Sequence, residues 1–217
     1  MKESYEEYRE RMDYDPDRSA GYAERKLQPK HQREVDLVDR ALAHLPSGLS
    51  VLDIPSGGGR FTLHLANLGY AASGGDRSAT MVEITGRNLS EAGHPANARV
   101  LDIEALDMAD DSIDAVFCFR LFHHLPEKEL RDKVVSEICR VAKDYVVMSY
   151  FNSRCVNMVR RKWRDRLKGQ IYKKYGTPLS EVEAYFSKHG YELVVDYAEK
   201  KGFKPLHIAV FKAPAAN

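Results

Sequence analysis

Two kinds of residue suited to ligand chemistry, a carboxylate and a run of glycines, stand close together in VLDIPSGGGR, residues 51–60. The apolar residues around Asp53 are typical of a buried parallel strand. The glycines at 57–59 let a backbone approach a ligand closely, and the apolar spacing that follows predicts a helix over 60–68. A strand, a glycine loop and a helix in this order indicate a site for a nucleotide-like ligand.

Two further acids occupy comparable places along the chain. Asp76 lies nineteen residues after Gly57, at the end of the next apolar segment, where such folds place a ribose-binding carboxylate. Asp102 follows the strand-like residues 98–101. Because a ligand of an open parallel sheet sits at the carboxyl ends of the strands, we expect the three acids to meet at that edge.

The details of the loop separate two classes of cofactor. A dinucleotide fingerprint requires a third small residue to pack helix on strand, and Thr62 stands at that position. Asp53 would also repel a pyrophosphate, whereas it suits a cationic ligand. S-adenosylmethionine carries a sulfonium and an ammonium group. An NAD-dependent oxidoreductase is therefore the less favoured alternative, and the chain has little room for its substrate domain.

With these residues in place, the chain resembles the class I S-adenosylmethionine-dependent methyltransferases. Their first motif, roughly D-x-G-x-G-x-G after an apolar strand, is matched by Asp53, Gly57 and Gly59, while Pro55 replaces the first glycine. The segment RLFHHLP, residues 120–126, resembles the type 11 group that acts on small molecules. The resemblance implies S-adenosylmethionine as the cofactor.

The resemblance also implies roles for single residues. Asp76 would hold the ribose hydroxyls, and Asp102 with Ile103 would meet the adenine. The full set of cofactor-binding residues expected on this basis is Asp53, Pro55, Gly57, Gly59, Asp76, Arg77, Asp102, Ile103, Phe119 and Arg120.

Two histidines, His123 and His124, follow the predicted fourth strand and are the candidate catalytic residues. A histidine with an ordinary pKa of about 6.5 can accept a proton from an acceptor hydroxyl. The resemblance places the family's histidine at His124, and a loop histidine that only shapes the pocket is the alternative. Because the Asn/Asp-Pro-Pro-Tyr signature is missing after this strand, an oxygen, carbon or other small-molecule acceptor is favoured.

Alternation of apolar segments predicts the fold class, an α/β protein with a Rossmann-like, seven-stranded, mainly parallel sheet flanked by helices and an antiparallel C-terminal strand. The closing hairpin is an expectation from the resemblance. Helices are predicted at 31–45, 60–68, 82–89, 129–141 and 179–189, and strands at 51–54, 98–101, 113–119, 145–150, 191–197 and 206–212.

Length and composition favour one catalytic domain. The 217 residues, 43% hydrophobic and 30% charged, suffice for a full core. We expect the methyltransferase domain over residues 31–217 and an N-terminal extension or lid over 1–30. In the extension, Tyr22, Arg25 and Lys26 are candidates to fold over the site.

A basic segment at 154–174 holds nine basic residues against one acid. Val156, Val159, Trp163 and Leu167 share one helical stripe, which predicts a helix docked by its apolar face. The resemblance implies a cap insertion over the acceptor pocket, at about 154–176. A phosphate-bearing or otherwise anionic small acceptor would suit it. The alternatives are a solvated helix face and, less favoured, binding to nucleic acid or a membrane surface through Arg154–Lys174.

Overall charge and cysteine usage add two expectations. The formal net charge is only +1, so the protein as a whole has no electrostatic field that would attract a polyanion. The three cysteines form no CxxC pair, so they resemble reduced residues and predict no metal site. The charged N-terminus and the lack of a long apolar run lead us to expect a cytoplasmic protein.

Overall fold

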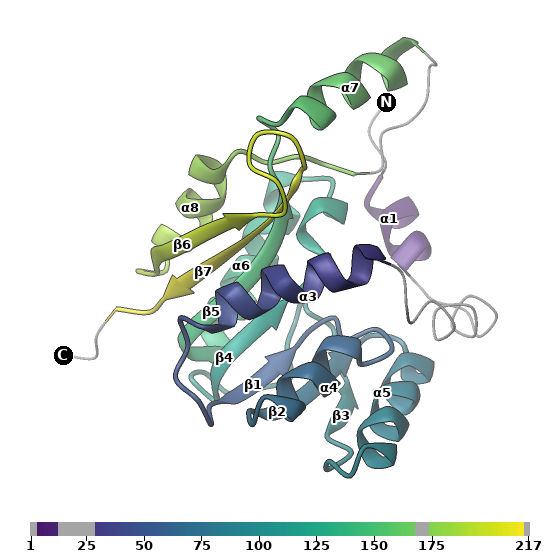
Figure 1. Cartoon of the computed structure of the whole chain (residues 1–217), viewed down its shortest axis with the longest axis vertical. Coiled ribbons are helices and arrows are strands. Elements are labelled where there is room, and N and C mark those ends of the chain that lie inside the picture. Colours follow the sequence, from purple (N-terminus) through teal and green to yellow (C-terminus); the bar gives the residue numbers. More distant parts are fainter. Residues whose placement is uncertain (1–3, 13–28, 168–173, 215–217) are drawn as a thin grey trace.

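The computed structural model describes residues 4–12, 29–167 and 174–214, and it contains one seven-stranded sheet in the order β3-β2-β1-β4-β5-β7-β6 (Figure 1). Neighbouring strands from β3 to β5 pair in parallel, and β7 pairs antiparallel with both β5 and β6. The strands are β1 Ser50–Asp53, β2 Ala71–Asp76, β3 Ala98–Val100, β4 Ile113–Cys118, β5 Ala142–Phe151, β6 Glu192–Ala198 and β7 Leu206–Lys212. The predicted Rossmann-like sheet with an antiparallel C-terminal strand is confirmed.

Each predicted helix is present, with bounds that differ by a few residues. The helices are α1 Tyr5–Met12, α3 Pro29–Leu42, α4 Arg60–Asn67, α5 Ala79–Glu91, α6 Lys128–Val141, α7 Val156–Leu167 and α8 Leu179–Ser187, with a short 3-10 turn, η1, at Phe122–His124. The pairing order reverses between β1 and β4, and ligands of open α/β sheets bind at the carboxyl ends of strands beside such a switch point.

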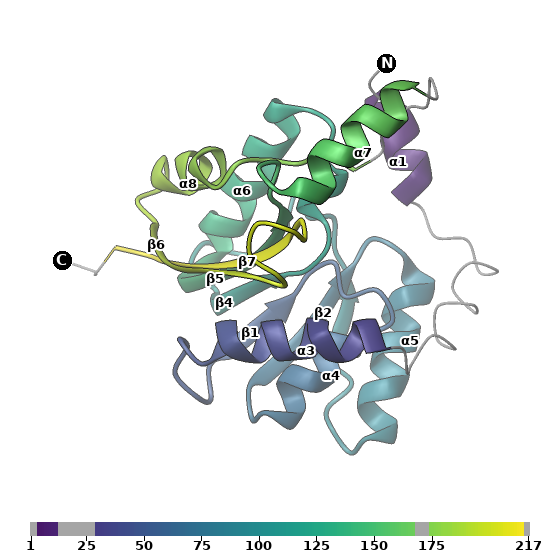
Figure 2. The ribbon, with the colours of Figure 1, turned by 45° about the horizontal axis from the view of Figure 1, so that its top comes forward.

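The two faces of the sheet carry separate apolar cores. In β4, Ala115 and Phe117 face the core under α3 and α4, whereas Val116 and Cys118 face the core under α6 and α8. This alternation follows from the two-residue period of a strand. Because both faces are covered, as Figure 2 also shows, the sheet edge at the ends of β1, β2 and β4 is the place where a ligand has access.

The predicted docking of the basic helix is wrong. Val156, Val159 and Trp163 are 46%, 49% and 68% exposed. Instead, the buried Cys155 and Met158 anchor the start of α7, and the loop before β7 accepts hydrogen bonds from the amides of the first turn. The remainder of α7 projects from the body of the domain (Figures 1 and 2). Periodicity identified an apolar stripe, but it contains no information on whether another element covers that stripe.

Candidate active site

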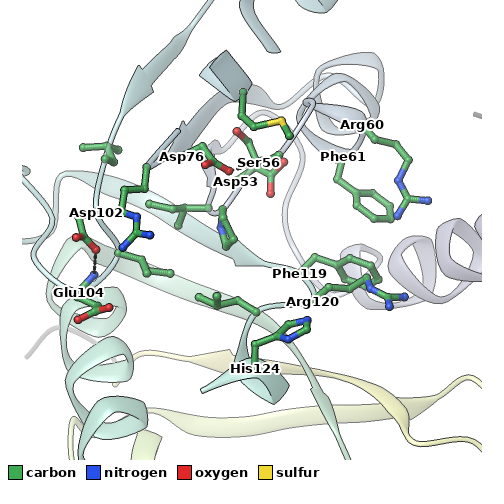
Figure 3. Close-up of a pocket in the computed structure, with 18 of the residues that line it drawn as sticks. Asp53, Ser56, Arg60, Phe61, Asp76, Asp102, Glu104, Phe119, Arg120 and His124 are labelled. Carbon is green, nitrogen blue, oxygen red and sulfur yellow. Dashed lines mark hydrogen bonds between the residues drawn. The ribbon is translucent and has the colours of Figure 1, made fainter. Parts of the chain in front are cut away.

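A pocket of about 470 Å³ lies at the carboxyl ends of the strands (Figure 3). It is lined by residues of the N-terminal helix, of the loops after β1, β2, β3 and β4, and of the segment after α7. These residues are Tyr8, Arg9, Asp53, Ile54, Pro55, Ser56, Gly57, Arg60, Phe61, Asp76, Arg77, Met81, Leu101, Asp102, Ile103, Glu104, Phe119, Arg120, Leu121, His124 and Lys174.

The glycine loop is tied to its surroundings by its own backbone groups. The Gly57 amide donates to the Asp76 carboxylate at 2.9 Å, and the Gly57 carbonyl accepts a hydrogen bond from the Thr85 hydroxyl at 2.8 Å. Gly59 has φ +77°, and a Cβ there would lie 2.8 Å from the Thr85 side chain. Gly59 therefore supports the loop against α5, while Gly57 and Ser56 line the pocket.

Asp53 lines the pocket and is only 2% exposed. The Thr62 hydroxyl donates to its carboxylate at 2.7 Å, so the residue that breaks the dinucleotide pattern is the partner of the acid. Burial raises the pKa of Asp53 to about 7, the Thr62 hydrogen bond opposes this shift, and the nearby charge of Asp76 adds to it. Burial raises the pKa of Asp76 as well.

Asp102 and Glu104 form an acidic side of the pocket, which α1 covers. The Arg9 guanidinium lies 2.9 Å from each of these two carboxylates, and the Tyr5 hydroxyl donates to Glu104 at 2.6 Å. Burial acts to raise the pKa of Asp102, but the Glu104 amide and Arg9 outweigh it and the pKa is lowered. Tyr8 of the same helix is only 3% exposed and belongs to the apolar core that includes Leu101 and Ile103.

Two arginines, Arg60 and Arg120, line the opposite side (Figure 3). Both pair with Glu34, a buried residue of α3. The aromatic ring of Phe119 packs edge-on against Phe61 at a centroid distance of 4.6 Å beside them. The pocket therefore has the Asp102 and Glu104 carboxylates on one side, where Arg9 pairs with them, and the Arg60 and Arg120 guanidinium groups on the other.

The two candidate catalytic histidines occupy different surroundings. His124 lines the pocket. His123 has no exposed surface, and its ring stacks on Phe151 at a centroid distance of 3.7 Å. The backbone carbonyl of His123 also accepts a hydrogen bond from the Tyr175 amide at 2.7 Å. The geometry thus brings His124, and not His123, into contact with the pocket volume, and the catalytic role of each stays a prediction.

The expected cofactor residues converge on this one pocket, with Gly59 as the supporting exception. The expected lid residues Tyr22, Arg25 and Lys26 lie outside the described residues. Sequence reasoning missed several of the lining residues and their support. These are Tyr8, Arg9, Ser56, Arg60, Phe61, Met81, Glu104 and Leu121 in the lining, with Glu34 behind Arg60. Lys174, which also lines the pocket, was predicted only as part of the basic cap segment.

A signal existed for some of the missed residues. Arg60 directly follows the glycine run, and Glu104 follows the predicted adenine pair by one residue. Glu34 lies on a helix before the first strand, and nothing in its sequence neighbourhood separates it from other helical acids. Its partners are 26 and 86 residues away, so only the packing of α3 identifies it.

The fold and the acids around the glycine loop define the class of this protein. Residues 51–145 match the family model of a methyltransferase domain. Together with the seven-stranded sheet, this match over 95 of the 217 residues identifies a class I S-adenosylmethionine-dependent methyltransferase domain in the chain.

Curated relatives come from one group of enzymes. The ubiquinone biosynthesis O-methyltransferase of Paramagnetospirillum magneticum is 32% identical over 89 residues, which are 41% of this chain and 35% of that protein. The protein of the same name from Cupriavidus pinatubonensis is 27% identical over 161 residues, 68% of this chain and 62% of its own length. The chain spans about a third of the length of the first curated relatives that it matches.

Solved structures share the fold at low identity. The magnesium protoporphyrin IX methyltransferase of Synechocystis PCC 6803, solved with bound S-adenosylhomocysteine, has a TM-score of 0.72 and 22% identity, with 85% of this chain and 84% of that chain covered. The PH0226 protein of Pyrococcus horikoshii OT3 has a TM-score of 0.70 and 17% identity, with 87% and 93% covered.

Among the residues that the structure describes, no helix is long and apolar enough to cross a membrane. Over the same ranges, no group of three or more His, Cys, Asp or Glu side chains could hold a metal ion.

Proposed function

We propose that this protein transfers a methyl group from S-adenosylmethionine to a small acceptor that carries an acidic group. The observation that carries the proposal is the meeting of Asp53, Asp76 and Asp102 with the glycine loop in one pocket at the switch point of the sheet. Three acids at the ends of three successive strands suit this donor, because it carries two cationic groups and also a ribose and an adenine that can donate hydrogen bonds to carboxylates.

Residues at the acidic side fit the adenosyl part of the donor. Asp76 presents a carboxylate at the end of β2 for the ribose hydroxyls, and Arg77 lies next to it. Asp102 and the apolar Ile103 would meet the adenine. The loop of Pro55 and Gly57 with Asp53 beneath it would hold the methionine end, together with Phe119 and Arg120.

Methyl transfer requires the protein mainly to position the donor and the acceptor. When bound, S-adenosylmethionine supplies a methyl group on a sulfonium, a good leaving group. Residues that hold an acceptor nucleophile about 3 Å from that carbon and in line with the bond gain most of the available acceleration. His124 is placed at the pocket to accept a proton from an acceptor hydroxyl, and His123 would support it from the core.

An anionic acceptor is favoured by the basic side of the pocket. Arg60 and Arg120 come from α4 and from the end of β4, and Lys174 comes from the segment after α7. The proposed cap at 154–176 would contribute through Lys174, since no described residue of α7 lines the pocket. The names of the curated relatives support an oxygen acceptor on a small molecule.

The N-terminal extension is proposed to act as a lid. Helix α1 places Tyr8 and Arg9 in the pocket lining, and the Arg77 guanidinium donates to the Arg9 carbonyl at 2.8 Å. A lid of this kind would exclude water from the reacting groups.

One observation favours a second candidate function, a non-catalytic S-adenosylmethionine-binding scaffold or sensor. Trp163 is exposed on α7, beside basic residues such as Arg160 and Arg164, and no described residue of this helix lines the pocket. Charge reversal at Arg160, Arg161 and Arg164 separates the two functions. Lost turnover with retained cofactor affinity supports the cap, and lost partner binding in a protein without turnover supports the scaffold.

Calorimetric titration tests the donor before any acceptor is known. The purified protein is titrated with S-adenosylmethionine, S-adenosylhomocysteine and NAD. We expect micromolar binding of the two adenosyl compounds and no binding of NAD. Binding of NAD alone, or of none of the three, would overturn the proposal. A screen of small carboxylates and phosphates with radiolabelled methyl donor then identifies the acceptor.

A further inference from the structure

Glu34 joins two pocket arginines that are far apart in the sequence. The Nη2 atom of Arg60 lies 2.7 Å from Oε2 of Glu34, and Nη1 of Arg120 donates to the other carboxylate oxygen, Oε1. Arg60 begins α4 and Arg120 follows β4, so three separate elements supply the cluster. One carboxylate between two guanidinium groups leaves the cluster with a formal charge of +1.

The acid lies behind the arginines, and the arginines face the pocket. The Glu34 side chain is 3% exposed, whereas those of Arg60 and Arg120 are 31% and 27% exposed. In Figure 3 the two arginines lie on the same side of the pocket, next to Phe119 and away from Asp102. A ligand in the pocket would therefore meet positive charge on this side, not the carboxylate.

The Arg60 guanidinium is held in place, but one of its hydrogen-bond donors has no acceptor among the described residues. Its Cζ lies 4.2 Å from the centroid of the Phe61 ring, and one of its nitrogens, Nη2, donates to Glu34. Nη1 is buried and has no hydrogen-bond acceptor among the described residues. A buried donor of this kind carries a desolvation cost that an oxygen acceptor would remove, and the cost is larger for a charged group.

The Arg120 backbone adds a second, independent indication. Its φ of 65° lies in the left-handed region, which residues other than glycine rarely adopt. Its amide donates to the Ser149 hydroxyl at 2.6 Å, which helps to hold this conformation. Strained backbone of this kind persists where the surroundings enforce it, and it is concentrated at ligand sites.

We infer that Arg60 and Arg120 form an oxyanion subsite within the pocket and that Glu34 is its positioning residue. The inference rests on the proposed function, because it assumes a ligand in this pocket. The ligand group is a carboxylate or phosphate, whose oxygens match the paired N–H donors of a guanidinium. Two sources carry this chemistry: the methionyl carboxylate of the donor and the acidic group of the acceptor.

Three probes distinguish the sources. S-adenosylhomocysteine carries the carboxylate, whereas 5′-methylthioadenosine is the same adenosyl thioether without the amino-acid end. Inorganic phosphate, titrated into protein saturated with methylthioadenosine, reports on an oxyanion site that the nucleoside leaves open. Each probe is titrated calorimetrically into wild type and into the Arg60→Gln, Arg120→Gln and Glu34→Gln variants. Arg87→Gln, an exposed arginine of α5 outside the pocket, is the matched control.

If the donor supplies the oxyanion, Arg60→Gln and Arg120→Gln should each weaken S-adenosylhomocysteine about tenfold or more and leave methylthioadenosine within about twofold. If the acceptor supplies it, both adenosyl ligands should keep their affinity and phosphate binding should be lost in the same variants. Glu34→Gln should follow the arginine variants, because its amide oxygen accepts from one guanidinium while its NH2 group opposes the other. A purely structural role for Glu34 would weaken all three probes together.

The inference is overturned if the folded arginine variants bind all three probes as wild type does. Thermal denaturation identifies variants that fail to fold, and Arg60→Lys and Arg120→Lys then replace them; each keeps the charge but loses the paired donors, so a loss of the same probe is still expected. Wild-type protein that binds neither adenosyl ligand contradicts the proposed function instead, and phosphate binding to wild type and variants still tests the subsite.

Discussion

The Asp76 carboxylate accepts a hydrogen bond from the Gly57 amide at 2.9 Å, and this contact joins the end of β2 to the glycine loop after β1. Its other oxygen accepts from the Ser78 amide at 3.0 Å, at the start of α5. One side chain thus sets the distance between the two loops that would hold the donor. It also remains in the pocket lining, with access to a ligand.

Replacement of Asp76 should therefore weaken the donor. We expect Asp76→Ala to reduce the affinity for S-adenosylmethionine by about 1.5–3 kcal/mol, because charged hydrogen bonds to the ribose are lost. Calorimetric titration measures the change, and Asp107→Ala, an exposed acid outside the pocket, serves as the control. Unchanged affinity in folded Asp76→Ala protein would contradict the assignment.

Donor binding should depend on pH through Asp53. Its pKa is raised from 3.8 to about 7, so the carboxyl is largely protonated in the folded protein at pH 5.5. A cationic ligand favours the ionised form, and binding below pH 7 must release this proton. Affinity for S-adenosylmethionine should therefore rise between pH 5.5 and about 7.5, with proton release seen in buffers of different ionisation enthalpy.

Asp53→Asn is the control for this pH dependence. The affinity of this variant for S-adenosylmethionine should be lower than that of wild type at pH 7.5 and should change little with pH. In the unfolded chain Asp53 ionises at a lower pH than in the folded protein. The free energy of unfolding of wild type should therefore fall between about pH 4 and 7, compared with that of Asp53→Asn over the same range. If donor affinity and the free energy of unfolding from urea denaturation change with pH equally in the two proteins, the role of this carboxyl is refuted.

The N-terminal helix should control access to the pocket. Arg9→Ala removes the contacts with Asp102 and Glu104 that hold α1 in place. We expect S-adenosylhomocysteine to associate and dissociate faster in this variant, because α1 opens more often. Stopped-flow fluorescence gives both rate constants. Glu10→Gln, an exposed residue of the same helix, should leave them unchanged; identical rates in all three proteins would exclude a lid function.

The two histidines should respond differently to removal. His123→Ala leaves a cavity against Phe151 and should destabilise the fold by about 2–4 kcal/mol. His124→Ala should change stability little and keep donor affinity, and it should lower turnover once an acceptor is known. Chemical denaturation and calorimetry separate the effects. A His123→Ala protein as stable as wild type would contradict the structural role of His123. A His124→Ala protein as active as wild type would contradict the catalytic role of His124.

Gly59 and Gly48 provide a matched pair for the glycine loop. Both have φ near +77°, but a Cβ at Gly59 would lie 2.8 Å from Thr85, whereas nothing lies within 4 Å of one at Gly48. Gly48→Ala should cost about 1–2 kcal/mol of stability from backbone strain alone. Gly59→Ala should cost about 1–3 kcal/mol more, because Thr85 and α5 must shift. Equal losses in urea denaturation would show that the close packing at Gly59 is unimportant.

Much of the fold and part of the site follow from local patterns. The strand ending in Asp53, the glycine run, and the acids at Asp76 and Asp102 are read directly, because strand, turn and helix leave short-range signatures. The order of strands along the chain then places these acids at one edge. This is why nearly all the expected cofactor residues line one pocket.

The tertiary structure decided the remainder. Arg9 closes the acidic side, Glu34 holds Arg60 and Arg120 at the basic side, and His123 is withdrawn from the pocket while His124 lines it. Each outcome depends on contacts between elements that are distant in sequence. The exposed stripe of α7 has the same origin, since periodicity defines an apolar face but not what covers it. Local sequence thus determined the elements and the acids that they carry, whereas packing between elements determined which charges meet across the pocket.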